Sequence, residues 1–507
     1  ELNGGFLGFI CVKNGDWAQE SKKVDRFAKN ISDMIIGRES EIQELKAAAE
    51  SEYSEFVVVY GRRRVGKTYL VRETFDYTFT FQHSGVANVT KREQIKNFIS
   101  SLRKHGMAIS RIPKTWFEVF DLLEEFLDKS PDKKKLVFLD ELPWMDSQKS
   151  NFVSALEHFW NNWASARKDV LLIVCGSATS WIMKNIVKNR RGLHNRLTHK
   201  IKLPQFTLAE CEEYAEYRKL GYSREMLLET YMALGGIPYY WSLLLPGLSV
   251  SQNIDKLMFA ESGKLRDEFD ELYASLFSNS ENYISVISKL GEKRTGLTRN
   301  EIIEGLSAIR NGHITKILRD LEWCGFIRSY KSYGKKTKDV IYQLIDHYTL
   351  FYFRFIKNQD INDEAFWTNT IGQPVHTTWC GLAFERVCLC HIPQIKAKLG
   401  ISGVLTNYCA WRTEADEELG IYGTQIDLLL DRKDNIINIC EMKYSSDEYV
   451  VTKDYDTELR RKKNAFKVKT KTRKALHVTM VTTYGVHKNM YSGNIQSQVT
   501  MDDLFVK

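Results

Sequence analysis

The chain has 507 residues, a formal net charge of +8 and 43% apolar residues. That length predicts about three or four domains at roughly 100–200 residues each. No apolar run approaches the roughly 20 residues of a membrane helix, so we expect no membrane partner. The net charge is too modest to identify a nucleic-acid-binding protein, so such a partner must be argued from where the basic residues cluster. The nine cysteines include no C-x-x-C pair, which favours reduced thiols and a cytoplasmic protein.

Short apolar runs alternate with helical patterns in the first part of the chain. Continuous runs at 56–60, 136–139 and 171–175 predict buried strands, and 78–82 predicts a weaker strand. Strands that alternate with helices indicate a parallel α/β sheet with helices on both faces. We assign this core to residues 34–205 and treat residues 1–33 as an N-terminal extension to which we assign no function.

Three further regions follow the core. Residues 206–275 have a helical pattern that is broken at 235–238, which predicts a helical lid. Residues 276–361 predict three helices and then a basic hairpin, the outline of a winged helix, with a capping box at Thr298 to Glu301. Residues 362–507 return to mixed helix and strand. Within them Cys388, Cys390 and His391 could ligate zinc, but a buried apolar helix is the favoured interpretation.

A phosphate-binding loop follows the first predicted strand and precedes a predicted helix. The segment fits G-x-x-x-x-G-K-[ST] in full and consists of Gly61, Arg62, Arg63, Arg64, Val65, Gly66, Lys67 and Thr68. Its glycines let backbone N–H groups surround a phosphate, Lys67 reaches the β and γ oxygens, and the Thr68 hydroxyl binds Mg²⁺. A chance match is the alternative, but the strand before it and the helix after it favour a nucleotide site.

Two carboxylates end the strand predicted at 136–139. Asp140 would hold Mg²⁺, and Glu141 would polarise the attacking water, at the edge where α/β sheets bind ligands. The alternative is a strand that ends in a solvated acidic turn; the phosphate-binding loop makes the nucleotide interpretation the better one.

Weaker candidates follow the next strand. Ser177 lies where a polar group could sense the γ-phosphate, although a Gly-Ser turn often follows a strand for purely structural reasons. Arg196 is a candidate to stabilise charge in the transition state, with Arg190 and Arg191 as rivals, and a solvated surface arginine is the alternative for each. No Asn-Lys-x-Asp guanine reader occurs, which favours ATP over GTP.

The chain from about residue 34 resembles the AAA+/STAND group of P-loop ATPases. The resemblance rests on Ile36-Gly-Arg-Glu39, the phosphate-binding loop, Asp140-Glu141 and Gly236-Ile-Pro238. It is greatest with archaeal and bacterial ATPases that carry a C-terminal domain of unknown function. In that family the Gly-Arg-Glu segment borders the adenine and the Gly-x-Pro turn closes over the nucleotide. The resemblance therefore implies that Gly37, Arg38 and Pro238 lie near ATP.

The predicted hairpin of the winged helix is basic. Arg328, Lys331, Lys335, Lys336 and Lys338 crowd it, and a third helix in the major groove with such a wing on the phosphates is one docking geometry for DNA. A winged helix that only packs or regulates is the alternative, and the sequence leaves both open.

The C-terminal region resembles the PD-(D/E)xK nucleases, which have a restriction-endonuclease-like α/β fold. Glu385 lies on a predicted helix, Asp427 on a strand, and Glu441 and Lys443 share one face of the next strand because they are two residues apart. Ile426 replaces the proline of the pattern. The resemblance implies that Asp427 and Glu441 hold Mg²⁺ and that Lys443 activates water. The pattern is loose, so a nuclease-like fold kept for binding or assembly is the alternative.

A basic run follows this pattern. It contains Lys453, Arg460, Arg461, Lys462, Lys463, Lys467, Lys469, Lys471, Arg473 and Lys474. A phosphate backbone would be attracted to such a run, although charge runs are more often solvated helix faces.

The sequence as a whole predicts a cytoplasmic ATPase that acts on DNA, uses ATP and Mg²⁺, and carries a C-terminal nuclease. One alternative is an ATP-switched regulator whose nuclease-like domain binds a partner. The other is an ATPase that loads or remodels protein. A homo-oligomer is left open.

Overall fold

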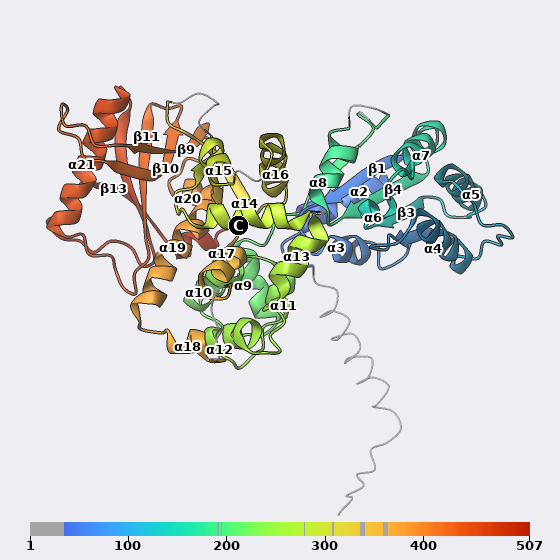
Figure 1. Cartoon of the computed structure of the whole chain (residues 1–507), viewed down its shortest axis with the longest axis horizontal. Helices are drawn as coiled ribbons and strands as arrows, with labels where there is room; N and C mark the ends of the chain where they lie inside the picture. Colours follow the sequence, from blue (N-terminus) through green and yellow to red (C-terminus); the bar gives the residue numbers. More distant parts are fainter. Residues whose placement is uncertain are drawn as a thin grey trace, which may run out of the picture.

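The structure, a computed structural model, describes residues 35–189, 192–193, 195–277, 279–306, 309–334, 340–357 and 363–507. Two β-sheets lie toward opposite ends of the long axis, with helices between them (Figure 1). The predicted extension, residues 1–33, lies outside the described residues.

The first sheet has five strands in the order β2-β3-β4-β1-β5, and every neighbouring pair is parallel. The strands are β1 (Glu55–Tyr60), β2 (Phe81–Ser84), β3 (Lys135–Asp140), β4 (Val170–Gly176) and β5 (His199–Lys202). The weaker strand predicted at 78–82 begins at Phe81. β4 is buried along its whole length, as expected for a strand that is covered on both faces.

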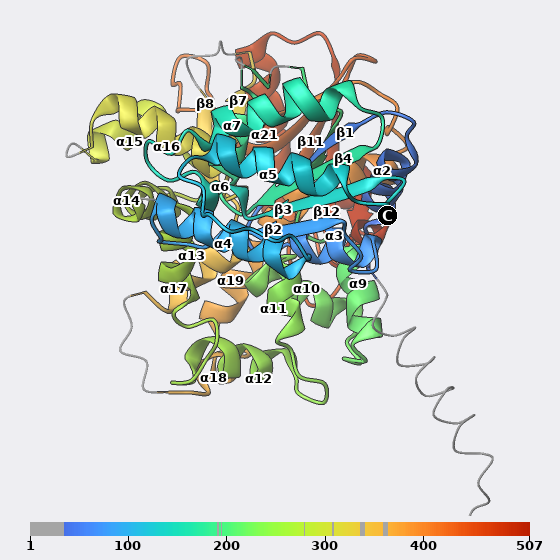
Figure 2. The same ribbon diagram turned by 90° about the vertical axis from the view of Figure 1, so that its right-hand side faces the viewer.

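Successive side chains of β1 enter different hydrophobic clusters on the two faces of this sheet. Val57 and Val59 join one cluster, and Phe56 and Val58 join the other. Figure 2 shows α4 and α5 in front of the sheet on the second face. The helices of the core are α2 (Glu39–Glu50), α3 (Lys67–Thr74), α4 (Lys91–Lys104), α5 (Trp116–Asp128), α6 (Leu142–Met145), α7 (Phe152–His158) and α8 (Thr179–Ile182).

The lid is helical, as predicted, and is broken at Gly235–Ile237. Gly236 is required there because a Cβ at this position would lie 2.0 Å from the Phe206 carbonyl oxygen. The Phe206 N–H donates to the Gly236 carbonyl at 2.6 Å, which fixes the close approach. The lid helices are α9 (Leu208–Tyr217), α10 (Arg224–Leu234), α11 (Pro238–Ser242), α12 (Val250–Ile254) and α13 (Glu268–Leu276).

Three helices and a hairpin follow the lid, in the order predicted. Thr298 and Glu301 form the expected capping box at the start of the second helix. The elements are α14 (Ser280–Gly291), β6 (Leu297–Thr298), α15 (Arg299–Gly305), α16 (Asn311–Trp323), β7 (Ile327–Ser332), β8 (Val340–Leu344) and α17 (His347–Phe355). Lys335, Lys336 and Lys338 of the predicted wing lie outside the described residues.

The second sheet has eight strands in the order β13-β12-β11-β10-β9-β7-β8-β6. It therefore joins the hairpin strands to the C-terminal strands, because β7 pairs in parallel with β9 at Lys331 and Ser332. This pairing covers a hairpin edge that would otherwise be open. The remaining elements are α18 (Phe366–Asn369), α19 (Pro374–Cys390), α20 (Ile392–Lys398), β9 (Thr406–Thr413), β10 (Thr424–Arg432), β11 (Ile436–Lys443), α21 (Lys453–Thr470), β12 (Ala475–Thr482) and β13 (Ile495–Thr500).

One hydrophobic cluster runs from the first sheet through the lid to α17, α19 and the C-terminus. It includes Val57 of β1, Tyr231 of α10, Phe351 of α17 and Leu504 near the C-terminus. The lid and the C-terminal half are therefore packed as one core. None of the helices in the described ranges is both long and apolar enough to cross a membrane.

Candidate nucleotide site

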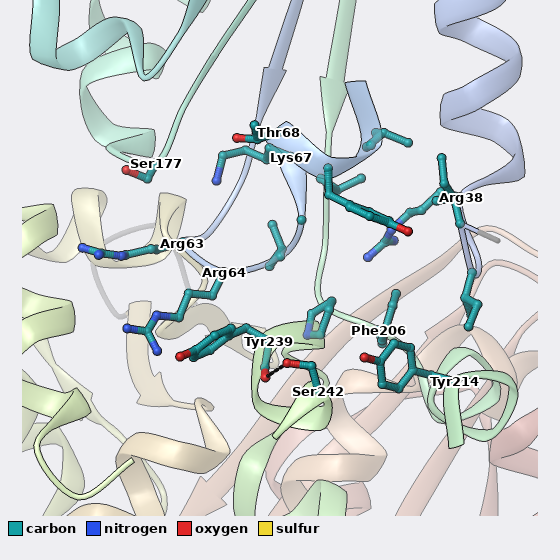
Figure 3. A pocket seen from close by; sticks show the side chains of 18 of the residues that line it. Arg38, Arg63, Arg64, Lys67, Thr68, Ser177, Phe206, Tyr214, Tyr239 and Ser242 are labelled. Carbon is teal, nitrogen blue, oxygen red and sulfur yellow. Dashed lines mark hydrogen bonds between the residues drawn. The ribbon is translucent and has the colours of Figure 1, made fainter. Parts of the chain in front are cut away.

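A cavity of about 650 Å³ lies between the first sheet and the lid, within the size range of small-molecule sites. In Figure 3, Lys67 and Ser177 lie at one end of it, and Arg38, Phe206 and Tyr214 at the other. Of the residues proposed from the sequence, those that line the cavity are Arg38, Arg63, Arg64, Val65, Gly66, Lys67, Thr68, Glu141, Ser177 and Pro238. The polar end and the aromatic end together match the phosphate and base ends of a nucleotide.

The phosphate-binding loop leads from β1 into α3, as predicted. Gly66 has φ of +88°, and Gly61 has φ of +152° with no room for a side chain, because a Cβ there would lie 2.2 Å from the Leu203 carbonyl oxygen. The Lys67 ammonium donates to the Gly61 and Arg62 carbonyls at 3.1 and 2.9 Å. Burial lowers the pKa of Lys67, while nearby acidic groups, among them Glu141 and Asp140, act in the opposite direction.

Asp140, at the end of β3, accepts several hydrogen bonds through its carboxylate. The Thr68 hydroxyl donates to its carboxylate oxygens, at 3.2 and 3.0 Å, and the Glu141 N–H donates at 2.9 Å. The Cys175 thiol of β4 donates to the same carboxylate at 2.6 Å. Burial, and next the charge of Asp140, raise the pKa of Cys175 well above its ordinary value, so the thiol remains a donor. The sequence predicts Cys175 only as part of a buried strand.

Glu141 and Ser177 form a pair at the carboxyl ends of β3 and β4. The Ser177 hydroxyl donates to Glu141 Oε2 at 2.8 Å, and its backbone N–H donates at 3.0 Å. Glu141 has φ of +48°, a left-handed conformation that is uncommon for a residue other than glycine. Such strain concentrates at functional sites. Ser177 therefore orients the carboxylate predicted to polarise water.

The side chains of the arginines in the phosphate-binding loop point in different directions. The buried Arg62 turns away from the cavity and forms an ion pair with Asp346, whose Oδ2 accepts from Nη2 at 3.1 Å, and it stacks over Phe326. Arg64 pairs with Glu268 of the lid at 2.7 Å and lies over Tyr239, its guanidinium carbon 4.2 Å from the ring centroid. The structure does not bring the Arg62 side chain to the cavity that was proposed to use it.

The far end of the cavity is built by the lid and by the segment before α2. Arg38 donates to the Pro204 carbonyl at 2.8 Å and lies over Phe206. Gly37 has φ of +63° and lies against Glu210, where a Cβ would come within 2.3 Å of the side chain. Residues of the lining that the sequence analysis missed include Tyr214, Arg218 and Tyr239. Only their positions on helices beside the Gly-x-Pro break could have indicated them.

Arg196 lies away from this cavity. It is exposed and precedes β5, whose other end, at Lys202, pairs with Tyr60 beside the phosphate-binding loop. Because β5 is parallel to β1, Arg196 is at the edge of the sheet opposite to the cavity, and the structure does not place it on a nucleotide in the same chain. Arg190 and Arg191 lie outside the described residues.

Comparison with known proteins matches the same region. Residues 35–244 match the family model of an ATPase domain predominantly from Archaea. These residues form an ATPase domain of the archaeal type. The matched residues contain the first sheet, the lid helices α9 to α11 and all the residues that line the cavity.

Similarity to individual proteins is low. The uncharacterized protein MJECL04 of Methanocaldococcus jannaschii is 24% identical over 359 residues, which are 70% of this chain and 76% of that protein. A Walker-type ATPase of Pyrococcus abyssi is 16% identical with a TM-score of 0.46, over 63% of this chain and 96% of that one. The Aeropyrum pernix ORC2 protein is 15% identical with a TM-score of 0.38, over 63% and 93%.

Outside the ATPase domain, the C-terminal sheet brings the predicted nuclease residues near one another. Leu428 pairs with Cys440 in the antiparallel β10–β11 ladder, so Asp427 and Glu441 are the next residues on the two strands. Lys443 follows on the face of Glu441. Glu385 of α19 is joined to this group through Arg294, which donates to Glu385 at 2.8 Å. Burial acts to lower the pKa of Arg294, but the charge of Glu385, and after it those of Asp427 and Glu441, raise it.

Two carboxylates of this group, Glu441 and Glu385, are already paired with cations of the protein, whereas Asp427 accepts from the Gln425 side-chain amide. Lys462 of α21 donates to both oxygens of Glu441 at 3.0 Å, and Tyr455 donates to one of them at 3.2 Å. Glu385 is 1% exposed and pairs with Arg294 and with Arg386, the latter at 2.7 Å. Within the described residues no three His, Cys, Asp or Glu side chains are grouped as metal ligands. In this arrangement the donor set does not fit a metal ion.

The possible zinc ligand His391 and the basic run of the C-terminal half are also engaged by contacts within the protein. His391 accepts from the Leu208 N–H at 3.0 Å and is buried in the apolar packing of α19, as favoured over zinc. In the basic run, Arg460, Lys462, Lys469 and Lys474 pair with carboxylates. The run is therefore less positive than its sequence suggests.

Proposed function

We propose that the chain is an ATP-driven switch of the AAA+/STAND kind, in which nucleotide occupancy of the cavity controls a C-terminal half that acts on DNA. The single observation that carries this proposal is the buried pair between Arg62 and Asp346. It ties the phosphate-binding loop to the first turn of α17, more than half the chain away in sequence.

The residues of the cavity fit ATP with Mg²⁺. Thr68 and Asp140 offer oxygen donors 3.0 Å apart, and oxygen is the ligand that Mg²⁺ prefers. The ion, when bound, supplies positive charge to the β and γ phosphates. Lys67 would leave the loop carbonyls to bind the same oxygens. Glu141 would accept a hydrogen bond from the attacking water and orient it toward the γ-phosphate. Ser177 would act as a positioning residue by holding Glu141.

Two further contacts support transmission from the cavity. Arg64 joins the loop to Glu268 at the start of α13, and the Tyr239 N–H donates to the Arg64 carbonyl at 3.4 Å. Asp346 caps α17 by accepting from the Thr349 N–H at 3.0 Å. A change in the loop that accompanies nucleotide binding would therefore alter contacts to the lid and to α17 together, which is the differential contact that a switch needs.

Steady-state ATP hydrolysis, with and without DNA, tests this proposal. We expect DNA to change the turnover of the wild type, Lys67→Ala to abolish hydrolysis, and Asp346→Asn to retain hydrolysis but lose its response to DNA. Glu125→Gln, which removes an exposed ion pair of α5, is the matched control and should respond like the wild type. An ATPase whose turnover DNA leaves unchanged would be an ATP-switched regulator or a protein remodeller instead.

A Mg²⁺-dependent nuclease in the C-terminal half is the second candidate. The observation in its favour is the adjacent placement of Asp427 and Glu441, with Lys443 on the face of Glu441. Against it stand the cations on Glu441 and Glu385, and we derive no metal-dependent step from this arrangement. Cleavage of plasmid and oligonucleotide with Mg²⁺ or Mn²⁺, by the wild type and Lys443→Ala, decides the question. Cutting that Lys443→Ala retains, or no cutting with either metal, removes this candidate.

A further inference from the structure

A second cleft, of about 700 Å³, lies in the C-terminal half and is distinct from the nucleotide cavity. Its walls come from α14 and the segment after it, from α17, from α19 and from the end of β11. Figure 1 shows α14, α17 and α19 close together in the middle of the molecule. The cleft therefore lies where the helices after the lid meet the C-terminal sheet.

The charged side chains that line this cleft are mostly basic. Its basic lining residues are Lys293, Arg294, Arg354, Lys357, Arg386 and Lys443, whereas Glu292 is the acidic residue among the lining side chains. Arg294 and Arg386 are already paired with Glu385, and Lys293 with Glu301. Among the residues that the structure describes, Arg354, Lys357 and Lys443 form no ion pair with a carboxylate; the Lys443 ammonium lies 5.0 Å from the centroid of the Tyr455 ring. A concave surface with such a charge attracts an anion.

An apolar and aromatic surface lies between these cations. Phe353 and Tyr444 line the cleft and are half-buried, so part of each ring is accessible. The Lys357 ammonium lies 4.8 Å from the centroid of Phe353, and Gly291 packs against this ring, where a Cβ would lie 3.2 Å from the Phe353 Cδ2 atom. The ring is thus held in place, with the Lys357 ammonium over it.

We infer that this cleft binds a single strand of DNA, with phosphates on Arg354, Lys357 and Lys443 and a base on Phe353. Cations spread over separate elements around an accessible ring suit a chain of alternating phosphates and bases better than one small anion. A cleft of this volume encloses about one or two nucleotides and cannot enclose a duplex. The inference deepens the proposed action on DNA and rests on it.

The position of the cleft also relates it to the ATPase domain. Arg354 lies on the last turn of α17 and Lys357 just beyond it, whereas the first turn of the same helix is capped by Asp346, the partner of Arg62. Lys443 is at the end of β11, beside the Asp427 and Glu441 pair. A strand in this cleft would therefore contact both the helix that the phosphate-binding loop holds and the C-terminal carboxylates.

Fluorescence anisotropy with the full chain in EDTA tests the inference, since cleavage then cannot alter the probe. The probe is a labelled thymidine oligonucleotide of about 20 nucleotides, compared with a duplex and an RNA strand of equal length. Arg354→Glu with Lys357→Glu should weaken binding at least about tenfold and reduce the salt slope by roughly 1.4. Phe353→Leu should weaken binding without changing that slope, because it removes stacking and no charge.

Lys104→Glu with Lys133→Glu is the control, since both lysines are exposed in the ATPase domain and the change in net charge is the same. It should bind within about twofold of the wild type. ATP hydrolysis without DNA, unchanged in every variant, shows that each is folded.

Equal binding by the cleft and control variants overturns the cleft alone and leaves action on DNA elsewhere. Binding of RNA or duplex in preference overturns the assigned ligand. A wild type that binds no DNA overturns both the cleft and the proposed action on DNA. The ATPase is tested separately, by whether hydrolysis depends on Lys67.

Discussion

Replacing Asp346 by asparagine should destabilise the chain, because it leaves the Arg62 guanidinium buried without its counter-charge. Arg62 and Asp346 have side chains that are 7% and 1% exposed. Burial acts to raise the pKa of Asp346, but the Arg62 charge and the hydrogen bonds from Arg62 and Thr349 together outweigh burial, so the pKa is lowered. Asparagine caps a helix about as well as aspartate, so the contact to the Thr349 N–H is kept and the change reports on the charge.

The magnitude follows from the burial of the pair. Loss of one partner from a buried ion pair costs about 3–5 kcal/mol. Asparagine still accepts one hydrogen bond from Arg62, worth about 1 kcal/mol, so we expect a loss of about 2–4 kcal/mol for Asp346→Asn. Arg62→Met should cost a similar amount. The double variant has no stranded charge, and its loss should be smaller than the sum of the single losses by about 2–3 kcal/mol.

Equilibrium unfolding in urea, followed by tryptophan fluorescence, measures these differences. Glu125→Gln is the control, because its pair with Lys129 is exposed and should contribute less than about 1 kcal/mol. Losses that simply add in the double variant would refute the reasoning, since the two residues would then act independently. A loss for Asp346→Asn no larger than that of the control would refute it as well.

Three further predictions follow from the same contacts. Ser177→Ala should lower kcat for ATP roughly tenfold and leave KM unchanged, since it removes the hydroxyl that holds Glu141 and leaves only the backbone N–H, and steady-state kinetics would show it. Burial lowers the pKa of His391 to about 4, below its unfolded value of about 6.5. The resulting contribution to the free energy of unfolding, about 3 kcal/mol, is therefore complete above pH 6.5 and is lost as the pH falls toward 4. Thermal unfolding across this range should be flatter for His391→Gln, and an equal slope would count against the burial argument. Glu385→Gln should lower stability by about 3 kcal/mol in urea because Arg386 is stranded, and an unchanged midpoint would contradict that role.

The sequence allowed prediction of the features that depend on local pattern. The strand, loop and helix around Lys67, the acidic end of β3 and the break before Pro238 all follow from hydrophobic periodicity and from glycine at positions of positive φ or close approach. In the C-terminal half, the strands around Asp427 and Glu441 were predicted for the same reason.

Contacts between distant segments could not be predicted in this way. The phosphate-loop motif gives no signal that Arg62 turns to Asp346, because ion pairs between elements depend on tertiary packing. The pairing of β7 with β9, which joins two expected regions in one sheet, likewise depends on which edges meet in space. Arg196 was chosen by its place in the sequence, but the parallel direction of β5 puts it at the opposite edge of the sheet.

ATP binding and turnover by Glu141→Gln test the central claim most directly. Glutamine keeps the size of the side chain, but it accepts a hydrogen bond from water far less strongly than a carboxylate does. We predict that the variant binds ATP as tightly as the wild type in the presence of Mg²⁺, while its rate of hydrolysis falls by about 10²-fold or more. Hydrolysis at the wild-type rate would contradict the account, because the reaction would then not use the carboxylate that Ser177 holds in this cavity.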